Sequence, residues 1–414
     1  MLTERMAHVR SATVGVWVRR GSRHEAADMN GICHFIEHAV FKGTVRRSAL
    51  DIAVESDRLG GHFDAYTTHE MTGFAIKAID TALPQAFDLL ADMIARPRFA
   101  AEDLEREQKV IIEEMKMVED TPDELLAELF VAAYFPNHSL GRPIEGTPAT
   151  VSSFNGEVTA RFHAHAYAPR NLVIAAAGNV AHEQLVELTE RAFARDDSTD
   201  AGDQPVFDEP DNSPPVSAAP IFVQRKRELE QAHLILAAPW PSARDAERYA
   251  ASLLGSIIGG GTSSRLWQAV REERGLAYSV GASSSNFTDA GVFQIYAGTS
   301  PEQLDEVLDL SLAELRRVVR EPVPTEELQL VKDQAVSSIL LGLESTSARA
   351  GTLARQEITH GYRIAPDEII RRIEAVTPDD IQRVARAYFT SGGLALGALG
   401  DFNGFHVDRA RLEI

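Results

Sequence analysis

Hydrophobic and polar residues follow two different periods along the first half of the chain. In residues 12–22, ATVGVWVRRGS, they alternate at every second position, which is typical of a β-strand. In residues 82–97, ALPQAFDLLADMIARP, apolar side chains recur every three or four positions, which predicts an amphipathic helix. The whole first half reads as strand, helix, helix, strand pair, helix, helix and strand, over residues 12–22, 31–44, 48–61, 63–79, 82–97, 100–120 and 171–180.

The second half of the chain repeats this order of elements. It reads as strand, two helices, two strands, two helices and strand, over residues 232–240, 248–260, 263–275, 277–285, 291–300, 303–319, 324–345 and 394–401. The match is clearest between residues 99–114 (FAAEDLEREQKVIIEE) and 323–339 (VPTEELQLVKDQAVSSI). This pattern indicates an internal duplication of units of roughly 200 residues. We therefore predict an α+β fold with two homologous halves, each a mostly antiparallel sheet covered by helices.

A stretch rich in Pro, Asp and Ser separates the two halves. Residues 195–220 contain few periodic apolar positions, and such a composition is typical of a linker. We expect a first domain over residues 1–200, a linker over 201–219 and a second domain over 220–414.

Composition and charge exclude several classes of function. The 414 residues are 44% hydrophobic and 25% charged, as in globular proteins, and the net charge of −20 disfavours binding to nucleic acid. No apolar run approaches the ~20 residues that span a bilayer, so we expect no membrane partner. The single cysteine, Cys33, excludes an intrachain disulfide. With no secretory signal in the sequence, we expect a cytoplasmic protein.

Residues 31–44, GICHFIEHAVFKGT, place polar side chains in an otherwise apolar helix. His34 and His38 are four residues apart and therefore share one helix face, where two imidazole nitrogens can bind one metal ion. Glu37 precedes His38, and its carboxylate can take a proton from water at the open position of a catalytic zinc. This H-x-x-E-H order is the inverzincin signature. The alternative is a pair of hydrogen-bonded core histidines beside an unrelated glutamate.

A third ligand decides between these interpretations. Glu107 and Glu114 are seven residues apart, two turns along one face of the helix predicted over residues 100–120. Glu114 completes a His₂Glu site, and Glu107 is placed to hydrogen-bond a ligand histidine. Glu113 competes for the ligand role, but it sits about 100° round the helix from Glu114. The alternative here is a solvated acidic face.

Taken together, these motifs resemble the pitrilysin-like (inverzincin) zinc peptidases, and most closely the short-chain branch that includes the mitochondrial processing peptidase. The resemblance runs from about residue 8 to 400. It is carried, in order, by GICHFIEHAVFKGTVRRSA, LGGHFDAYTTHEMTGFA, REQKVIIEEMKMVEDTPDEL and YAPRNLVIAAAGNV. It implies that His34, His38 and Glu114 bind zinc. It also implies that Glu37 is the general base and Glu107 its supporting acidic residue.

The resemblance also implies how substrate is held. Residues 63–70, FDAYTTHE, resemble the edge strand that pairs with an extended peptide, which implicates Asp64 and the backbone of Ala65. Many relatives carry Asn at the position of Asp64. In the second half, Arg271 and Tyr278 match a pair that holds substrate carbonyls and stabilises an oxyanion. Relatives usually carry a further strand before the one at residues 12–22. This chain, by contrast, begins only shortly before the strand at residues 12–22.

The duplication limits the metal to one zinc per chain. The residues opposite His34, Glu37, His38 and Glu114 in the second half are Ser252, Gly255, Ser256 and Ser338, which cannot form such a site. In the short-chain branch, the metal-free half that faces the zinc belongs to a second subunit. Because this chain carries both motifs, we expect a clamshell-type homodimer whose Arg271 and Tyr278 act on the partner's zinc.

Two hypotheses of function follow. The first is a zinc metalloendopeptidase that hydrolyses unfolded or extended peptides inside a dimeric chamber. The second is a non-catalytic assembly subunit, like an inactive processing-peptidase chain or a core subunit of a respiratory complex. Such subunits typically lose zinc ligands or the base, and this sequence retains all of them.

Overall fold

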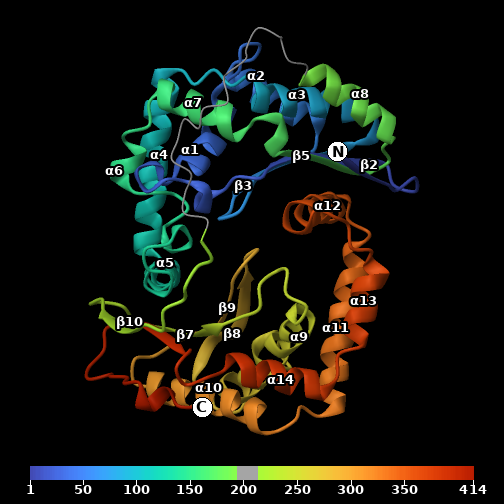
Figure 1. Cartoon of the computed structure of the whole chain (residues 1–414). Helices are drawn as coiled ribbons and strands as arrows, with labels where there is room; N and C mark the ends of the chain where they lie inside the picture. The colour runs from blue at the N-terminus through green and yellow to red at the C-terminus, as the bar shows by residue number, and fades with distance from the viewer. Residues whose placement is uncertain (194–212) are drawn as a thin grey trace. The chain divides into compact units, whose positions relative to one another are not determined.

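The structure is a computed structural model, and it describes residues 1–193 and 213–414 (Figure 1). Two compact units divide these residues. One unit contains Met1–Lys116, residues 142–193 and Leu341–Arg363, and the other contains Met117–Gly141, Ser213–Leu340 and Ile364–Ile414. Each unit is built on a five-stranded sheet, which confirms the predicted two-part α+β fold.

The two sheets have the same topology. In the first unit, the order is β1-β5-β2-β4-β3, with β1 Leu2–Arg5, β2 Ser11–Val18, β3 His62–Thr67, β4 Thr72–Ile79 and β5 Leu172–Gly178. In the second, it is β6-β10-β7-β9-β8, with β6 Ile221–Arg225, β7 Ala232–Pro239, β8 Ala277–Asn286, β9 Gly291–Thr299 and β10 Ala395–Gly400. The pairs β1–β5 and β6–β10 are parallel, and every other pair is antiparallel. The correspondence, strand for strand, supports the duplication.

The strand β1 corrects one expectation. The chain does carry a strand before β2, and Leu2–Arg5 pair with Ala175–Gly178 of β5. Four residues are too few for an alternation of hydrophobic and polar positions to be recognised, so β1 could not be predicted from the sequence pattern.

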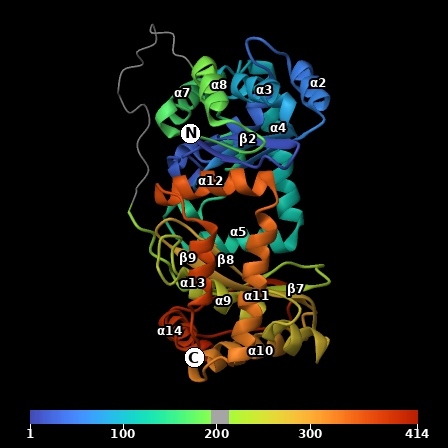
Figure 2. The ribbon, with the colours of Figure 1, turned by 90° about the vertical axis from the view of Figure 1, so that its right-hand side faces the viewer.

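The first sheet is covered on both faces. One face of β2 presents Val14 and Val16 to a core formed with α1 Ile32–Ala39 and α3 Leu83–Ala95, and the other presents Trp17 to α12 Thr346–His360. Figure 2 shows α3 and α12 on opposite sides of these strands. The other α-helices that lie wholly or mostly in the first unit are α2 Ala49–Leu59, α4 Ala101–Asp120, α6 Pro148–Val151, α7 Gly156–Ala166 and α8 His182–Ala192.

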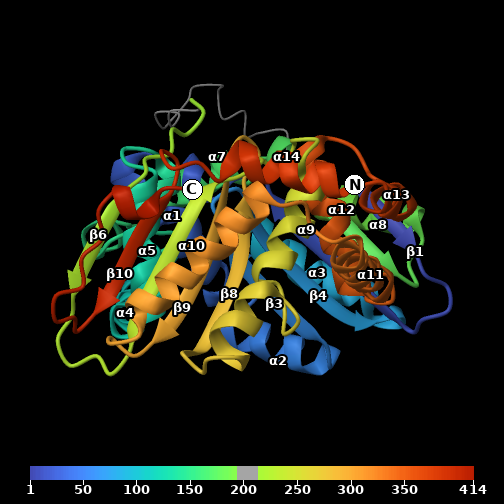
Figure 3. The ribbon, with the colours of Figure 1, turned by 90° about the horizontal axis from the view of Figure 1, so that it is seen from below.

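The second sheet is covered in the same way. Leu234 and Leu236 of β7 enter a core with α9 Arg248–Gly259 and α10 Leu304–Arg320, while Ile235 packs under α5 Pro122–Tyr134. Figure 3 shows α10 lying along the strands of this sheet. A π-helix, Trp267–Glu272, precedes β8, and the other helices are α11 Thr325–Gly342, α13 Pro366–Glu374 and α14 Pro378–Tyr388.

The two halves of the sequence exchange one helix. The helix α5 follows α4 in the first half but packs on β7 and β10, and α12 follows α11 in the second half but packs on β2 and β5. The compact units therefore do not coincide with residues 1–200 and 220–414. Most of the linker expected over residues 201–219 lies outside the described residues. Within the described part of the chain, no helix combines the length and the apolarity needed to cross a membrane.

Candidate metal and catalytic site

The helix α1 is held at its N-terminus by a buried carboxylate. Glu25 accepts hydrogen bonds from the backbone N–H of Gly31 at 2.7 Å and of Cys33 at 2.8 Å, and from Asn30 Nδ2 at 3.1 Å. These bonds satisfy backbone donors that the start of a helix leaves free. Gly31 has a positive φ of 96°, and a Cβ there would lie 2.5 Å from the carbonyl oxygen of Glu145, so only glycine fits. Burial raises the pKa of Glu25 to about 7.

The apolar face of α1 fixes the direction of its polar face. Ile32, Phe35 and Ile36 are fully buried in the core of the first unit. His34 and His38 therefore project from the other side, and their ring centroids lie 4.6 Å apart. The predicted sharing of one helix face by these histidines is what the structure shows.

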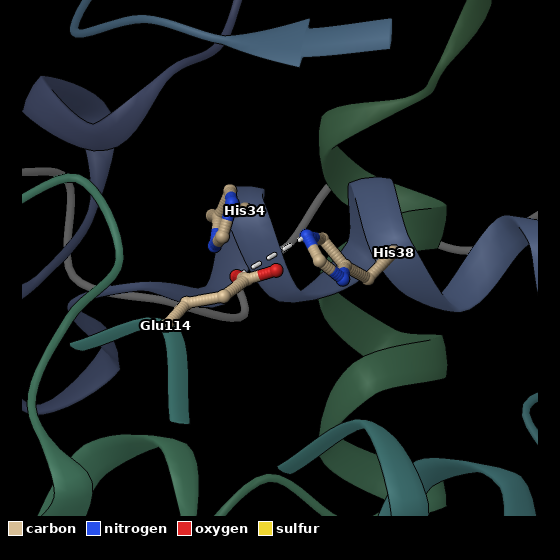
Figure 4. Close-up of side chains that lie close together, drawn as sticks. All are labelled: His34, His38 and Glu114. Carbon is tan, nitrogen blue, oxygen red and sulfur yellow. Dashed lines mark ion pairs between the residues drawn. The ribbon is translucent and has the colours of Figure 1, made fainter. Parts of the chain in front are cut away.

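Glu114 of α4 approaches the same two histidines. One ligand atom from each of His34, His38 and Glu114 lies within 4.8 Å of the other two, and His38 Nε2 is 3.7 Å from Glu114 Oε2. Figure 4 shows the carboxylate of Glu114 directed toward both imidazole rings. Glu113, the competitor for this role, is exposed and pairs with Lys116 at 2.7 Å. In the described part of the chain, this is the one group of at least three such side chains close enough to hold a metal ion.

Glu107 contacts His38 through Nδ1, the ring nitrogen that does not face Glu114. Its Oε2 lies 3.2 Å from His38 Nδ1, and its Oε1 lies 2.6 Å from Lys42 Nζ. Burial alone would raise the pKa of Glu107, but the hydrogen bonds from His38 and Lys42 outweigh it and lower this pKa. Because Nδ1 of His38 is engaged by Glu107, Nε2 is the nitrogen directed at His34 and Glu114.

His34 is suited to bind a cation as a neutral ligand. Burial, with a contribution from His38, lowers the pKa of His34 to about 4, so the ring is neutral at neutral pH. For His38, burial acts in the same direction, but the hydrogen bond with Glu107 and the charges of Glu114 and Glu37 raise the pKa overall. His34 Nδ1 is buried and has no hydrogen-bond partner among the described residues. Two imidazole nitrogens and one carboxylate oxygen are the donor set of a catalytic zinc, so these residues fit that metal.

Glu37 is buried beside this group and is held by a threonine. Its carboxylate oxygen Oε2 accepts a 2.6 Å hydrogen bond from Thr67 Oγ1, at the end of β3. Burial raises the pKa of Glu37, and the hydrogen bond from Thr67 opposes this rise. Thr67 could not be singled out from the sequence, because nothing in FDAYTTHE distinguishes it from Thr68.

The predicted substrate strand lies at the edge of the first sheet. β3 pairs only with β4, so its other edge is free of a described strand. Ala65 packs toward the core that contains α1, while Tyr66, on the opposite face, accepts a hydrogen bond from Trp17. Asp64 is exposed and, by strand alternation, shares the face of Tyr66.

Arg271 and Tyr278 lie together in the second unit. The guanidinium carbon of Arg271 lies 4.1 Å from the ring centre of Trp267 and 4.7 Å from that of Tyr278, and Arg271 Nη1 donates to the Tyr278 carbonyl at 2.8 Å. Tyr278 is 79% exposed. The pair is therefore ordered and accessible within its own unit.

Comparison with known proteins places the chain in a family. Two family models match it: "Insulinase (Peptidase family M16)" over residues 1–148, and "Peptidase M16 inactive domain" over residues 153–335. An uncharacterized zinc protease of Streptomyces coelicolor is 40% identical over 387 residues, which are 93% of this chain and 84% of the relative.

Solved structures agree with this placement. A protease from Helicobacter pylori matches with a TM-score of 0.86 at 23% identity, covering 94% of each chain. A chain of complex III2 from Candida albicans matches with a TM-score of 0.82 at 20% identity, covering 100% of this chain and 97% of that one. At such identities the likeness shows the fold alone. The two family models and the 40% identical relative show that this chain belongs to peptidase family M16.

Proposed function

We propose that the protein is a zinc-dependent endopeptidase that hydrolyses unfolded or extended peptides. The observation that carries this proposal is the convergence of His34, His38 and Glu114 from two helices, with Glu37 buried beside them. Relatives that span almost the whole chain are named zinc proteases, which supports the same conclusion.

The three converging side chains are the proposed ligands, with one zinc per chain. Zinc, when bound, supplies Lewis-acid polarisation of the scissile carbonyl and makes water more acidic. Glu107, by engaging Nδ1 of His38, would leave Nε2 of that ring as the nitrogen that holds the metal. The buried carboxylate of Glu37 accepts a proton from the attacking water and passes it to the leaving amine.

The substrate is proposed to bind as an additional strand along β3. An extended peptide pairs with such an edge through main-chain hydrogen bonds, with the backbone of Ala65 as one partner and Asp64 beside it. A folded domain offers no free strand of this kind, so we expect selection for unstructured segments. The net charge of −20 favours peptides with basic residues.

The second unit is proposed to act on the site of another copy of the chain. Arg271 and Tyr278 present a guanidinium and a phenol, which can bind substrate carbonyls and stabilise the developing oxyanion. In a homodimer, each chain would then supply a metal site to itself and an Arg/Tyr pair to its partner.

The test uses the purified full-length chain. We expect about one zinc per chain by elemental analysis and cleavage of an unstructured basic peptide, lost on chelation and restored by zinc. Glu37→Gln should keep the zinc and lower kcat by about 10²-fold or more, because the proton acceptor is gone. Glu113→Gln is the matched control, because Glu113 is an exposed neighbour of the proposed ligand Glu114. This substitution should leave the zinc content and kcat unchanged.

Two outcomes would contradict the proposal. Wild-type protein that binds zinc but cleaves no unstructured peptide would favour the assembly-subunit alternative. Full turnover in Glu37→Gln would remove Glu37 as the base, while leaving the metal site standing.

A further inference from the structure

The contact between Thr67 and Glu37 joins the edge strand to the base. Thr67 Oγ1 lies 2.6 Å from Glu37 Oε2, which is short for a neutral hydroxyl pair and typical of a hydroxyl that donates to a carboxylate. The two residues are thirty positions apart in sequence, on β3 and α1. This contact therefore depends on how the strand is set against the helix.

The backbone of Thr67 is held from both sides. It pairs with Thr72 of β4, and the turn that follows is closed by Thr68, whose N–H and Oγ1 both donate to the Met71 carbonyl. The carbonyl of Thr68 in turn accepts from the Ser22 N–H at 3.1 Å. The hydroxyl of Thr67 thus comes from a rigid part of the fold.

Only one oxygen of Glu37 is engaged in this way. Across residues 1–193 and 213–414, no side chain or backbone N–H donates to Glu37 Oε1. A carboxylate anchored through one oxygen loses rotational freedom about its last torsion and offers its second oxygen in a defined direction. A general base needs such a direction, because it must lie within hydrogen-bond reach of the proton that it accepts.

We propose that Thr67 is a positioning residue that orients the Glu37 carboxylate for proton transfer, an inference that rests on the proposed peptidase function. Thr67 and Ala65 occupy the same face of β3, the face that packs toward α1. The strand proposed to bind substrate is therefore also the strand that sets the base. A peptide paired along β3 would be placed in register with the base through one short piece of backbone.

Three substitutions test this role. Thr67→Val keeps the shape and removes the hydroxyl, and it should lower kcat about tenfold to a hundredfold, with KM within about twofold and zinc content unchanged. Thr67→Ser restores a hydroxyl and should recover kcat to within about threefold. Thr13→Val is the matched control, since Thr13 is buried on β2 and its hydroxyl contacts those of Thr346 and Ser347, at 2.8 and 3.1 Å, rather than Glu37. It should leave kcat unchanged.

A double-mutant cycle separates positioning from general damage. If Thr67 acts through Glu37, then adding Thr67→Val to Glu37→Gln should lower the residual kcat by less than about twofold, because the group it positions is already gone. Full additivity of the two losses would overturn the proposal, as would a Thr67→Val enzyme with wild-type kcat. If Thr67→Val fails to fold, Thr67→Ala serves in its place.

A crystal structure of the zinc-loaded protein and of Thr67→Val gives a readout independent of turnover. The Glu37 carboxylate should be ordered against Thr67 in the wild type and should rotate in the variant. An unchanged carboxylate in the variant would overturn the positioning role even in an active enzyme. Wild-type protein without peptidase activity would instead refute the proposed function, and the carboxylate orientation would still decide the positioning role.

Discussion

Lys42 and Glu107 form a 2.6 Å ion pair, and the same carboxylate contacts the ring of His38 through its other oxygen. Glu107 is 3% exposed, and each of its two carboxylate oxygens has one of these side chains as its partner. A ligand histidine held in this way keeps its tautomer and its orientation.

Replacing Glu107 by Gln should weaken zinc binding about tenfold to a hundredfold, because an amide cannot hold the imidazole and the ammonium as a carboxylate does. Competition with a chromophoric chelator measures this affinity. Glu105→Gln, an exposed residue two positions earlier on α4, is the control and should bind zinc like the wild type. Equal affinity of Glu107→Gln and wild type would show that Glu107 does not support the metal site.

The stability contribution of Glu25 should depend on pH. Burial raises the pKa of its carboxyl to about 7 in the folded chain, against a usual value of 4.5. Between these values the folded chain retains a proton that the unfolded chain has lost. Stability from this group therefore falls as the pH rises from about 4.5 to about 7 and is level above that.

The comparison of wild type with Glu25→Gln isolates this effect, since histidines with shifted pKa values titrate in the same range. The unfolding free energy of the wild type minus that of the variant should fall by on the order of 3 kcal/mol between pH 4.5 and 7. Urea denaturation at several pH values measures it. A difference that rises with pH would mean that the N–H groups of Gly31 and Cys33 stabilise the ionised carboxylate more than burial penalises it.

The exchanged helix α12 should be required for the stability of the first unit. Leu353 is 5% exposed and packs in one cluster with Trp17, although the two residues lie in different halves of the sequence. Leu353→Ala should destabilise this unit by about 2–5 kcal/mol, through lost burial and the cavity left behind. Leu341→Ala, at a position 68% exposed, should change stability by less than about 0.5 kcal/mol.

Fluorescence of Trp17 reports on this unit in a background where Trp240 and Trp267 are replaced by Phe. The denaturant concentration at the midpoint of unfolding, followed by Trp17 fluorescence, should be lower in Leu353→Ala than in the background protein. In Leu341→Ala it should be unchanged. An unchanged midpoint in Leu353→Ala would show that the sheet around Trp17 does not depend on α12.

The sequence was sufficient to predict the parts of the site that helical geometry determines. His34 and His38 share a face because they are four residues apart, and Glu107 and Glu114 share one because they are seven apart. For His34, His38 and Glu114 to converge, it was then enough that α1 and α4 pack against each other. The periods of the strands and helices predicted two similar halves for the same reason, since each period reflects local geometry.

Contacts that depend on tertiary packing were beyond this reasoning. Thr67 reaches Glu37 only because β3 lies against α1, and Lys42 reaches Glu107 only because the 3₁₀ helix that follows α1, Val40–Lys42, lies against α4. Neither α5 nor α12 was among the predicted elements, and an amphipathic pattern would show only that such a helix is buried, not on which sheet it packs. The duplication contained one clue, since α5 and α12 follow the equivalent helices α4 and α11.

Mixed dimers test whether the Arg/Tyr pair acts on the partner's metal site. Glu37→Gln removes the base from the first unit of one chain, and Arg271→Ala removes the guanidinium from the second unit of the other. If the pair acts in trans, each heterodimer regains one site with Glu37 and Arg271 both intact. Random pairing makes half of the dimers mixed, so the co-expressed mixture should show about a quarter of the wild-type activity. If the pair acts within its own chain, both chains are defective at their own sites and no activity returns.

Co-expression of Glu37→Gln with Glu114→Gln is the control, because both defects lie in the metal-binding unit. Recovery there would reveal reversion or contamination rather than complementation.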